Sequence, residues 1–138
     1  MSPPTAGYSG TPLAKKLGVG EGACVLAIDA PADYRKMLTP IPMGVIFVAK
    51  LSPRVDVTQL FIDKVATLEK RLKSLRNGIR PNSAVWISWP KKASKVPSDV
   101  SEDAIRSIVL PMGFVDVKVC AVNDTWSGLQ LVIRKELR

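Results

Sequence analysis

Residues 84–95, AVWISWPKKASK, decide the fold expected for this chain. A short, nearly continuous apolar run stops at Pro90 and leads at once into three lysines within five residues. Buried strands of parallel sheets have this composition, and the loops at their carboxyl ends are where α/β proteins place ligand sites. The segment therefore predicts both an α/β architecture and the edge of the sheet at which to look for function.

Two further apolar strands are expected upstream, at residues 23–30 and 45–51. Before the strand at 84–89, apolar residues recur at intervals of three and four, which predicts a long amphipathic helix. Asp56, with Gln59 three residues later, resembles a capping box that would open this helix. The apolar stripe of the helix consists of Phe61, Val65, Leu68, Leu72 and Leu75.

Downstream, Ser101 is placed to cap a helix over residues 102–112. Residues 115–121 and 129–134 alternate apolar and polar side chains, and the turn sequence NDTWSG joins them, which predicts an antiparallel hairpin. The expected order of elements is βαβαβαββ. Three parallel strands lie side by side through right-handed crossovers, and the C-terminal hairpin completes a single α/β layer sandwich.

Composition sets the domain organisation and the chemistry of partners. Residues 1–10, rich in proline, glycine and small polar residues, are expected to form a flexible N-terminal arm, and residues 11–138 a single α/β domain. Lys and Arg number 20 against 12 Asp and Glu, a formal net charge of +8. This surplus favours an anionic small molecule, an acidic protein or nucleic acid, or else serves solubility alone.

The chain contains no histidine and two cysteines, Cys24 and Cys120. Ser-His-Asp and Cys-His catalysis are therefore excluded, and no metal site is expected. Both cysteines lie in apolar, strand-like runs, which indicates free thiols and a reducing compartment. No apolar run approaches the ~20 residues of a membrane span, and no early segment resembles a signal peptide. We therefore expect a cytoplasmic protein without membrane contact.

Charged and aromatic residues are expected to gather where the strands end. Such a rim above an apolar floor suits a small molecule or a peptide. Lysines would clamp an anionic group, and an indole beside Pro90 would stack on the ligand. The alternative is a solvated loop whose lysines pair with Asp99, Glu102 or Asp103. The predicted ligand-binding residues are Asp29, Trp89, Lys91, Lys92, Asp124 and Trp126, and no catalytic residue is assigned.

The basic residues of the long helix offer a different interpretation. Lys70, Arg71, Lys73 and Arg76 lie between its apolar positions and could follow a nucleic-acid backbone. No recognised nucleic-acid motif accompanies them, so a solvated helix face is favoured and nucleic-acid association is an alternative. A small transferase with a reduced cofactor site is a further alternative.

Three segments resemble those of class I methyltransferases: LGVGEGACVLAID at 17–29, LKSLRNGIRPNSAVWIS at 72–88 and FVDVKVCAVNDTWSGLQLVIRK at 114–135. The resemblance implies a Rossmann-like, methyltransferase-like fold in which two early strands of the family are missing. It also places the family's cofactor-binding turn at residues 25–34, VLAIDAPADY.

The residues of that turn depart from the family's pattern. The acidic position that ends the family's first strand holds Ala27, and glycine positions that approach S-adenosylmethionine hold Asp29 and Pro31. A β-carbon and a proline obstruct that approach. The strand that would end in a ribose-binding carboxylate is expected to be absent. We therefore expect no cofactor, and a non-catalytic binding module rather than a transferase.

A second resemblance covers most of the chain. The segments GYSGTPLAKKLG at 7–18, SWPKKAS at 88–94 and VDVKVCAVNDTWSGL at 115–129 resemble an uncharacterised bacterial family known only as a domain of unknown function. This resemblance implies a bacterial cytosolic setting and no reaction. The expectation is a module that binds an anionic small molecule or protein partner at the carboxyl edge of its sheet. Ligand identity and oligomeric state stay open.

Overall fold

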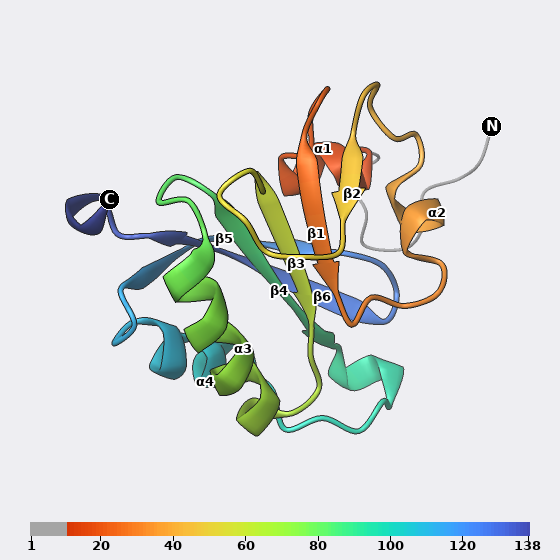
Figure 1. The fold of residues 1–138 in the computed structure, drawn as a ribbon. Coiled ribbons are helices and arrows are strands. Elements are labelled where there is room, and N and C mark those ends of the chain that lie inside the picture. The colour runs from red at the N-terminus through yellow and green to blue at the C-terminus, as the bar shows by residue number, and fades with distance from the viewer. Residues whose placement is uncertain (1–10) are drawn as a thin grey trace.

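A computed structural model describes residues 11–138, so the expected N-terminal arm, residues 1–10, lies outside the described residues. Six strands form one sheet in the order β2-β1-β3-β4-β6-β5 (Figure 1). The first four strands are parallel, and β6 runs antiparallel to both β4 and β5. The strands are β1 Cys24–Ile28, β2 Ile46–Val48, β3 Val57–Phe61, β4 Ala84–Pro90, β5 Phe114–Ala121 and β6 Trp126–Ile133.

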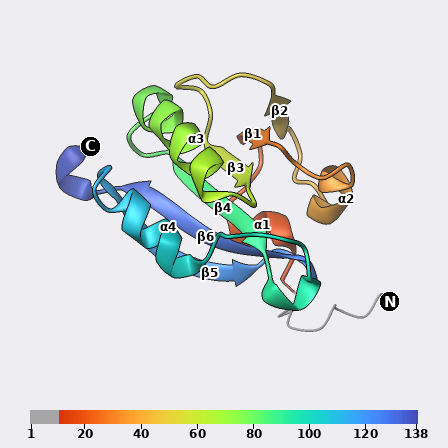
Figure 2. The ribbon, with the colours of Figure 1, turned by 90° about the horizontal axis from the view of Figure 1, so that it is seen from below.

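Helices cover both faces of the sheet (Figure 2). The longer pair, α3 and α4, packs on one face and the short pair, α1 and α2, on the other. Ser101 caps α4 as predicted, because its hydroxyl accepts a hydrogen bond from the amide of Ala104. The helices are α1 Leu13–Leu17, α2 Tyr34–Leu38, α3 Val65–Gly78 and α4 Glu102–Val109, with short 3₁₀ turns η1 Lys92–Ser94 and η2 Lys135–Leu137.

Strand β4 divides the core into two clusters. Val85, Ile87 and Trp89 pack on the face that α3 and α4 cover. Trp86 belongs to the opposite cluster, and its indole Nε1 donates a hydrogen bond of 2.9 Å to the carbonyl oxygen of Leu17 in α1. The indoles of Trp86 and Trp89 therefore face opposite sides of the sheet, because side chains alternate along a strand.

The α/β class and the closing hairpin are confirmed, but the expected count and order of strands were wrong. Five strands were expected, and the additional one, β3, occupies the beginning of the predicted long helix. All five residues of β3 are buried. It separates β1 from β4, so the three expected parallel strands do not lie side by side.

The capping box predicted at Asp56 was wrong for the same reason. Helix α3 begins at Val65, and Asp56 instead precedes β3. Its carboxylate accepts hydrogen bonds from the backbone amide of Cys24 at 2.8 Å and from Arg80 at 2.7 Å. Asp56 therefore joins the beginning of β1 to the segment that leads into β4.

The order of the parallel strands creates a topological switch point. The chain places β2 on one side of β1 and then crosses to place β3 on the other side. In open α/β sheets, ligands bind in the crevice outside the carboxyl ends of the strands where the order reverses. Here that place lies between the ends of β1 and β3. The described part of the chain holds no helix long and apolar enough to cross a membrane.

Candidate functional site

A cavity of about 200 Å³ opens at the switch point. It lies between the residue that follows β1, the end of β3, the first turn of α3 and the first residue of β6. The sheet and α3 thus bring together residues that are almost 100 positions apart in the sequence. The cavity is lined by Asp29, Phe61, Ile62, Asp63, Thr67 and Trp126.

Asp29 occupies a strained turn at the mouth of this cavity. Its φ is 56°, in the left-handed region that most residues other than glycine avoid and that aspartate tolerates better. Its carboxylate lies 3.0 Å from the Arg71 guanidinium on α3. Both side chains are about half exposed, so the ion pair is screened by solvent and orients Asp29 more than it stabilises the fold.

Two aromatic rings form the apolar wall of the cavity. The rings of Phe61 and Trp126 meet edge to face, with centroids 5.0 Å apart. The amide of Trp126 donates to Asn123 Oδ1 at 2.8 Å, which fixes the tight loop of the hairpin. Trp126 therefore packs back onto the rim from the hairpin.

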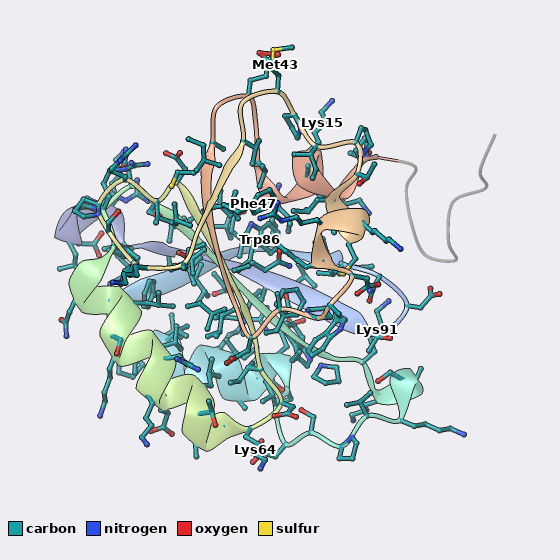
Figure 3. The ribbon with its side chains drawn as sticks, turned by 45° about the vertical axis from the view of Figure 1, so that its right-hand side comes forward. Lys15, Met43, Phe47, Lys64, Trp86 and Lys91 are labelled. Carbon is teal, nitrogen blue, oxygen red and sulfur yellow. The ribbon has the colours of Figure 1, made fainter. Side chains whose placement is uncertain are left out.

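The lysines that follow β4 border this wall. The amide of Lys91 donates to the carbonyl of Thr125 at 2.8 Å, so the chain stays paired to the hairpin beyond the end of β4. Figure 3 shows Lys91 at this carboxyl edge of the sheet. Lys91 is half-buried, and Lys92, the first residue of η1, is exposed.

The acidic side chains considered as partners of these lysines are engaged elsewhere. Asp99 accepts a hydrogen bond from the amide of Val65, and Glu102 and Asp103 pair with Arg106. Among the described residues, no carboxylate lies within 4.0 Å of the ammonium group of Lys91, Lys92 or Lys95. The two rim lysines thus remain available to an anionic ligand.

The other predicted site residues are placed less favourably. Trp89 is 8% exposed and packs in the core beneath α3 and α4, because it shares a strand face with Val85 and Ile87. It therefore presents almost no surface for stacking. Asp124 is exposed in the hairpin loop and does not line the cavity.

The sequence interpretation missed four cavity residues: Phe61, Ile62, Asp63 and Thr67. They were overlooked because residues 56–75 were assigned to a single helix. The dipeptide Asp63-Lys64 between the apolar run of β3 and the helical stripe was the available signal of a boundary.

Buried polar groups lie on the α1/α2 face behind the aromatic wall. Gln59 Nε2 donates to Ser88 Oγ at 3.1 Å, whereas Gln59 Oε1 and the Tyr34 hydroxyl have no hydrogen-bond partner among the described residues. Burial raises the pKa of the Tyr34 hydroxyl far above its usual range, so it stays neutral and cannot act as a base. Within residues 11–138, no three side chains of metal-ligating type gather at one place.

Comparison with known proteins identifies the fold. The structure resembles a protein assigned as a type 11 methyltransferase from Sulfolobus solfataricus, with a TM-score of 0.61, 13% identity, and coverage of 89% of this chain and 90% of that chain. It also resembles a SAM-dependent methyltransferase from Aquifex aeolicus, with a TM-score of 0.58, 16% identity and 88% of both chains covered. DhpI, solved as an SAH complex, matches with a TM-score of 0.59 at 11% identity over 90% of this chain and 83% of its own.

These likenesses confirm the methyltransferase-like Rossmann fold. No protein-family model and no curated protein matches the chain. The resemblance to a bacterial family of unknown function therefore stays a prediction.

The residues at the switch point do not fit S-adenosylmethionine as this fold class holds it. Asp29 and Pro31 stand where bare glycine backbone would approach the cofactor. The strand predicted at residues 45–51 is β2, and it lies next to β1, in the place of the strand that was expected to be absent. Ala49 and Lys50 follow β2 and supply no ribose-binding carboxylate.

Proposed function

We propose that this chain is a methyltransferase-like binding module that takes up a small anionic molecule at the carboxyl edge of its sheet and does not transfer a methyl group. The observation that carries the proposal is the cavity at the switch point between β1 and β3. Open α/β sheets bind their ligands at this place.

The side chains around the cavity favour a ligand with three parts. A flat apolar part would lie against Phe61 and Trp126. Hydroxyl or amine groups would donate hydrogen bonds to the carboxylates of Asp29 and Asp63. An anionic group would reach Lys91 and Lys92, whose ammonium groups act as point charges. A nucleoside monophosphate is a molecule of this kind.

A non-catalytic role is supported by the chemistry of the site. Acyl or phosphoryl transfer needs a nucleophile with an adjacent base, or a metal clamp. The chain has no histidine, and its buried tyrosine is held neutral. The turn after β1 lacks the glycines on which the cofactor of related folds rests.

The test is a thermal-shift titration with adenosine monophosphate, inorganic phosphate, S-adenosylmethionine and S-adenosylhomocysteine. A ligand that binds only the native state stabilises it by about 2.7 kcal/mol at 100 times its Kd, which raises Tm by several degrees. We expect a rise with adenosine monophosphate and none with the two sulfur compounds.

Two double variants distinguish binding at the proposed site from a general effect of positive charge. Lys91→Ala/Lys92→Ala should abolish the rise while leaving the Tm of the free protein nearly unchanged. Lys70→Ala/Lys73→Ala removes the same charge from the exposed face of α3 and should keep the rise. The proposal fails if adenosine monophosphate gives no rise in the unmodified protein, or an equal rise in both variants.

A further inference from the structure

Basic residues also gather at the opposite edge of the sheet, away from the cavity. The first turn of α3 lies beside the cavity at Thr67, and the helix ends at Gly78, two residues after Arg76. Strand β6 begins at the cavity with Trp126 and ends at Ile133, just before Arg134. Both elements therefore carry their last residues to the amino edge of the parallel strands. Figures 1 and 2 show η2 there, at the end of the molecule opposite η1.

These residues meet around Gly113, in the turn that joins α4 to β5. Arg76 Nε donates to the carbonyl of Met112 at 3.0 Å, and the amide of Arg134 donates to the carbonyl of Gly113 at 2.8 Å. A Cβ added at Gly113 would lie 2.8 Å from Leu137 Cδ1 and 3.4 Å from Arg76 Nη2, so the helix end and η2 approach this glycine closely. We call this surface the arginine corner; it consists of Arg76, Arg134, Lys135 and Arg138.

Two guanidinium groups of the arginine corner, those of Arg76 and Arg138, are held in place before any partner arrives. Arg138 Nε donates to the carbonyl of Ile133 at 2.8 Å, just as Arg76 Nε donates to Met112. Among residues 11–138, no protein group accepts a hydrogen bond from the Nη atoms of Arg76 or Arg138. Anchoring through Nε therefore leaves the Nη groups available to bind an anion. Because the side chains are already ordered, binding costs less conformational entropy.

The charge of the arginine corner is almost uncompensated. Within η2 and the residues flanking it, Glu136 is the sole acidic side chain, and it lies 3.7 Å from Arg134 with both side chains largely exposed. Such a pair is weak in water and exchanges readily for a stronger anion. Four cations from two distant segments, three of them exposed and Arg76 half-buried, thus share one corner with a single acidic side chain.

We propose that the arginine corner binds the phosphodiester backbone of a nucleic acid. Its cations are spread over a helix end and a terminal turn, so they match successive phosphates of an extended chain. Fixed guanidinium forks suit phosphate oxygens at set positions, whereas a membrane surface responds to charge without requiring geometry. This surface differs from the α3 face considered above, since three of its four cations follow β6.

The test is fluorescence anisotropy with a labelled 20-base-pair DNA duplex and a labelled 20-nucleotide RNA strand, over a series of salt concentrations. Arg134→Gln/Lys135→Gln/Arg138→Gln removes three cations without disturbing a buried side chain. We expect the slope of log K against log salt to shrink by roughly 2–3, since each phosphate contact contributes about 0.9 on duplex and 0.7 on single strands. The probe that binds more tightly identifies the form of nucleic acid that the arginine corner prefers.

Two comparisons complete the experiment. Lys15→Gln/Lys36→Gln/Lys95→Gln removes equal charge from exposed positions elsewhere and should leave the slope nearly unchanged. Arg138→Lys keeps the charge but loses the Nε anchor to Ile133, so it should weaken binding while retaining most of the slope. The proposal would be overturned if the two triple variants gave equal slopes or if the protein bound neither probe. Stronger binding to phosphatidylserine vesicles than to both probes would also overturn it.

Discussion

The two tryptophans of β4 offer a matched test of how the core is divided. Trp86 is fully buried beneath α1 and α2 and donates its indole hydrogen bond to Leu17. Trp89 is 8% exposed and packs beneath α3 and α4, and within residues 11–138 its indole nitrogen donates no hydrogen bond. Replacing each by phenylalanine removes the same atoms from opposite faces, but a hydrogen bond from only one.

The structure sets the size of the difference. Loss of the second ring should cost about 1–2 kcal/mol of packing on either face, less than the roughly 3–5 kcal/mol of truncation to alanine. In Trp86→Phe the carbonyl of Leu17, a residue 1% exposed, also loses its donor, which adds about 1–3 kcal/mol. We expect the free energy of unfolding to fall by about 2–5 kcal/mol in Trp86→Phe and by about 1–2 kcal/mol in Trp89→Phe.

Urea unfolding followed by circular dichroism measures both variants. With a slope of about 2 kcal/mol per molar urea, the midpoint of Trp86→Phe should lie roughly 0.5–1.5 M below that of Trp89→Phe. Amide hydrogen exchange in α1 should also accelerate in Trp86→Phe alone, because the lost bond ties that helix to the sheet. Equal midpoints and unchanged exchange in α1 would refute the reasoning.

Three further predictions concern the turns and ion pairs of the fold. The hydrogen bond from the amide of Cys24, and after it the bond from Arg80, lowers the pKa of Asp56. The contribution of Asp56 to the free energy of unfolding is therefore complete above its unfolded pKa and is lost as the pH falls through the lower folded pKa. Urea midpoints should drop below about pH 4, and they should drop less steeply in Asp56→Asn. Gly113→Ala should lower the stability measured in thermal unfolding by at least about 1 kcal/mol, because the φ of Gly113 is 94° and Leu137 crowds the site. Gly20→Ala should cost less, because a Cβ there meets no atom within 4 Å. Equal losses of stability in the two variants would contradict this. Ser101→Ala should lower stability by about 1 kcal/mol through loss of the α4 cap, and Ser101→Asp should restore it, as chemical denaturation would show.

The sequence predicted the strands that carry an unambiguous apolar run and the hairpin that carries strict alternation. Strand β3 escaped because it is five residues long and joins α3 through only three residues, 62–64. Its last residue, Phe61, falls on the helical spacing of Val65 and Leu68, and periodicity alone cannot separate such a short strand from a helix start. Only tertiary burial on both faces distinguishes them.

The candidate site was expected at the carboxyl edge of the sheet, where the cavity lies, but the cavity is lined by partly different side chains. Asp29 and Trp126 line the cavity, and the backbone amide of Lys91 pairs with Thr125, the neighbour of Trp126. Trp89 does not line the cavity, although its spacing of two from Ile87 already indicated that both lie on one face. Asp63 depends on where β3 ends, which the sequence interpretation did not place.

The most direct test of the central claim is a nuclear magnetic resonance titration with adenosine monophosphate. The three indole N–H signals of the chain report on three places: Trp126 at the cavity, Trp86 bonded to Leu17 and Trp89 in the opposite core. We predict a saturable shift of the Trp126 indole and of the Asp29 and Asp63 amides, with the Trp86 indole unmoved. Shifts confined to residues away from the cavity, or no saturable shift at all, would contradict the account.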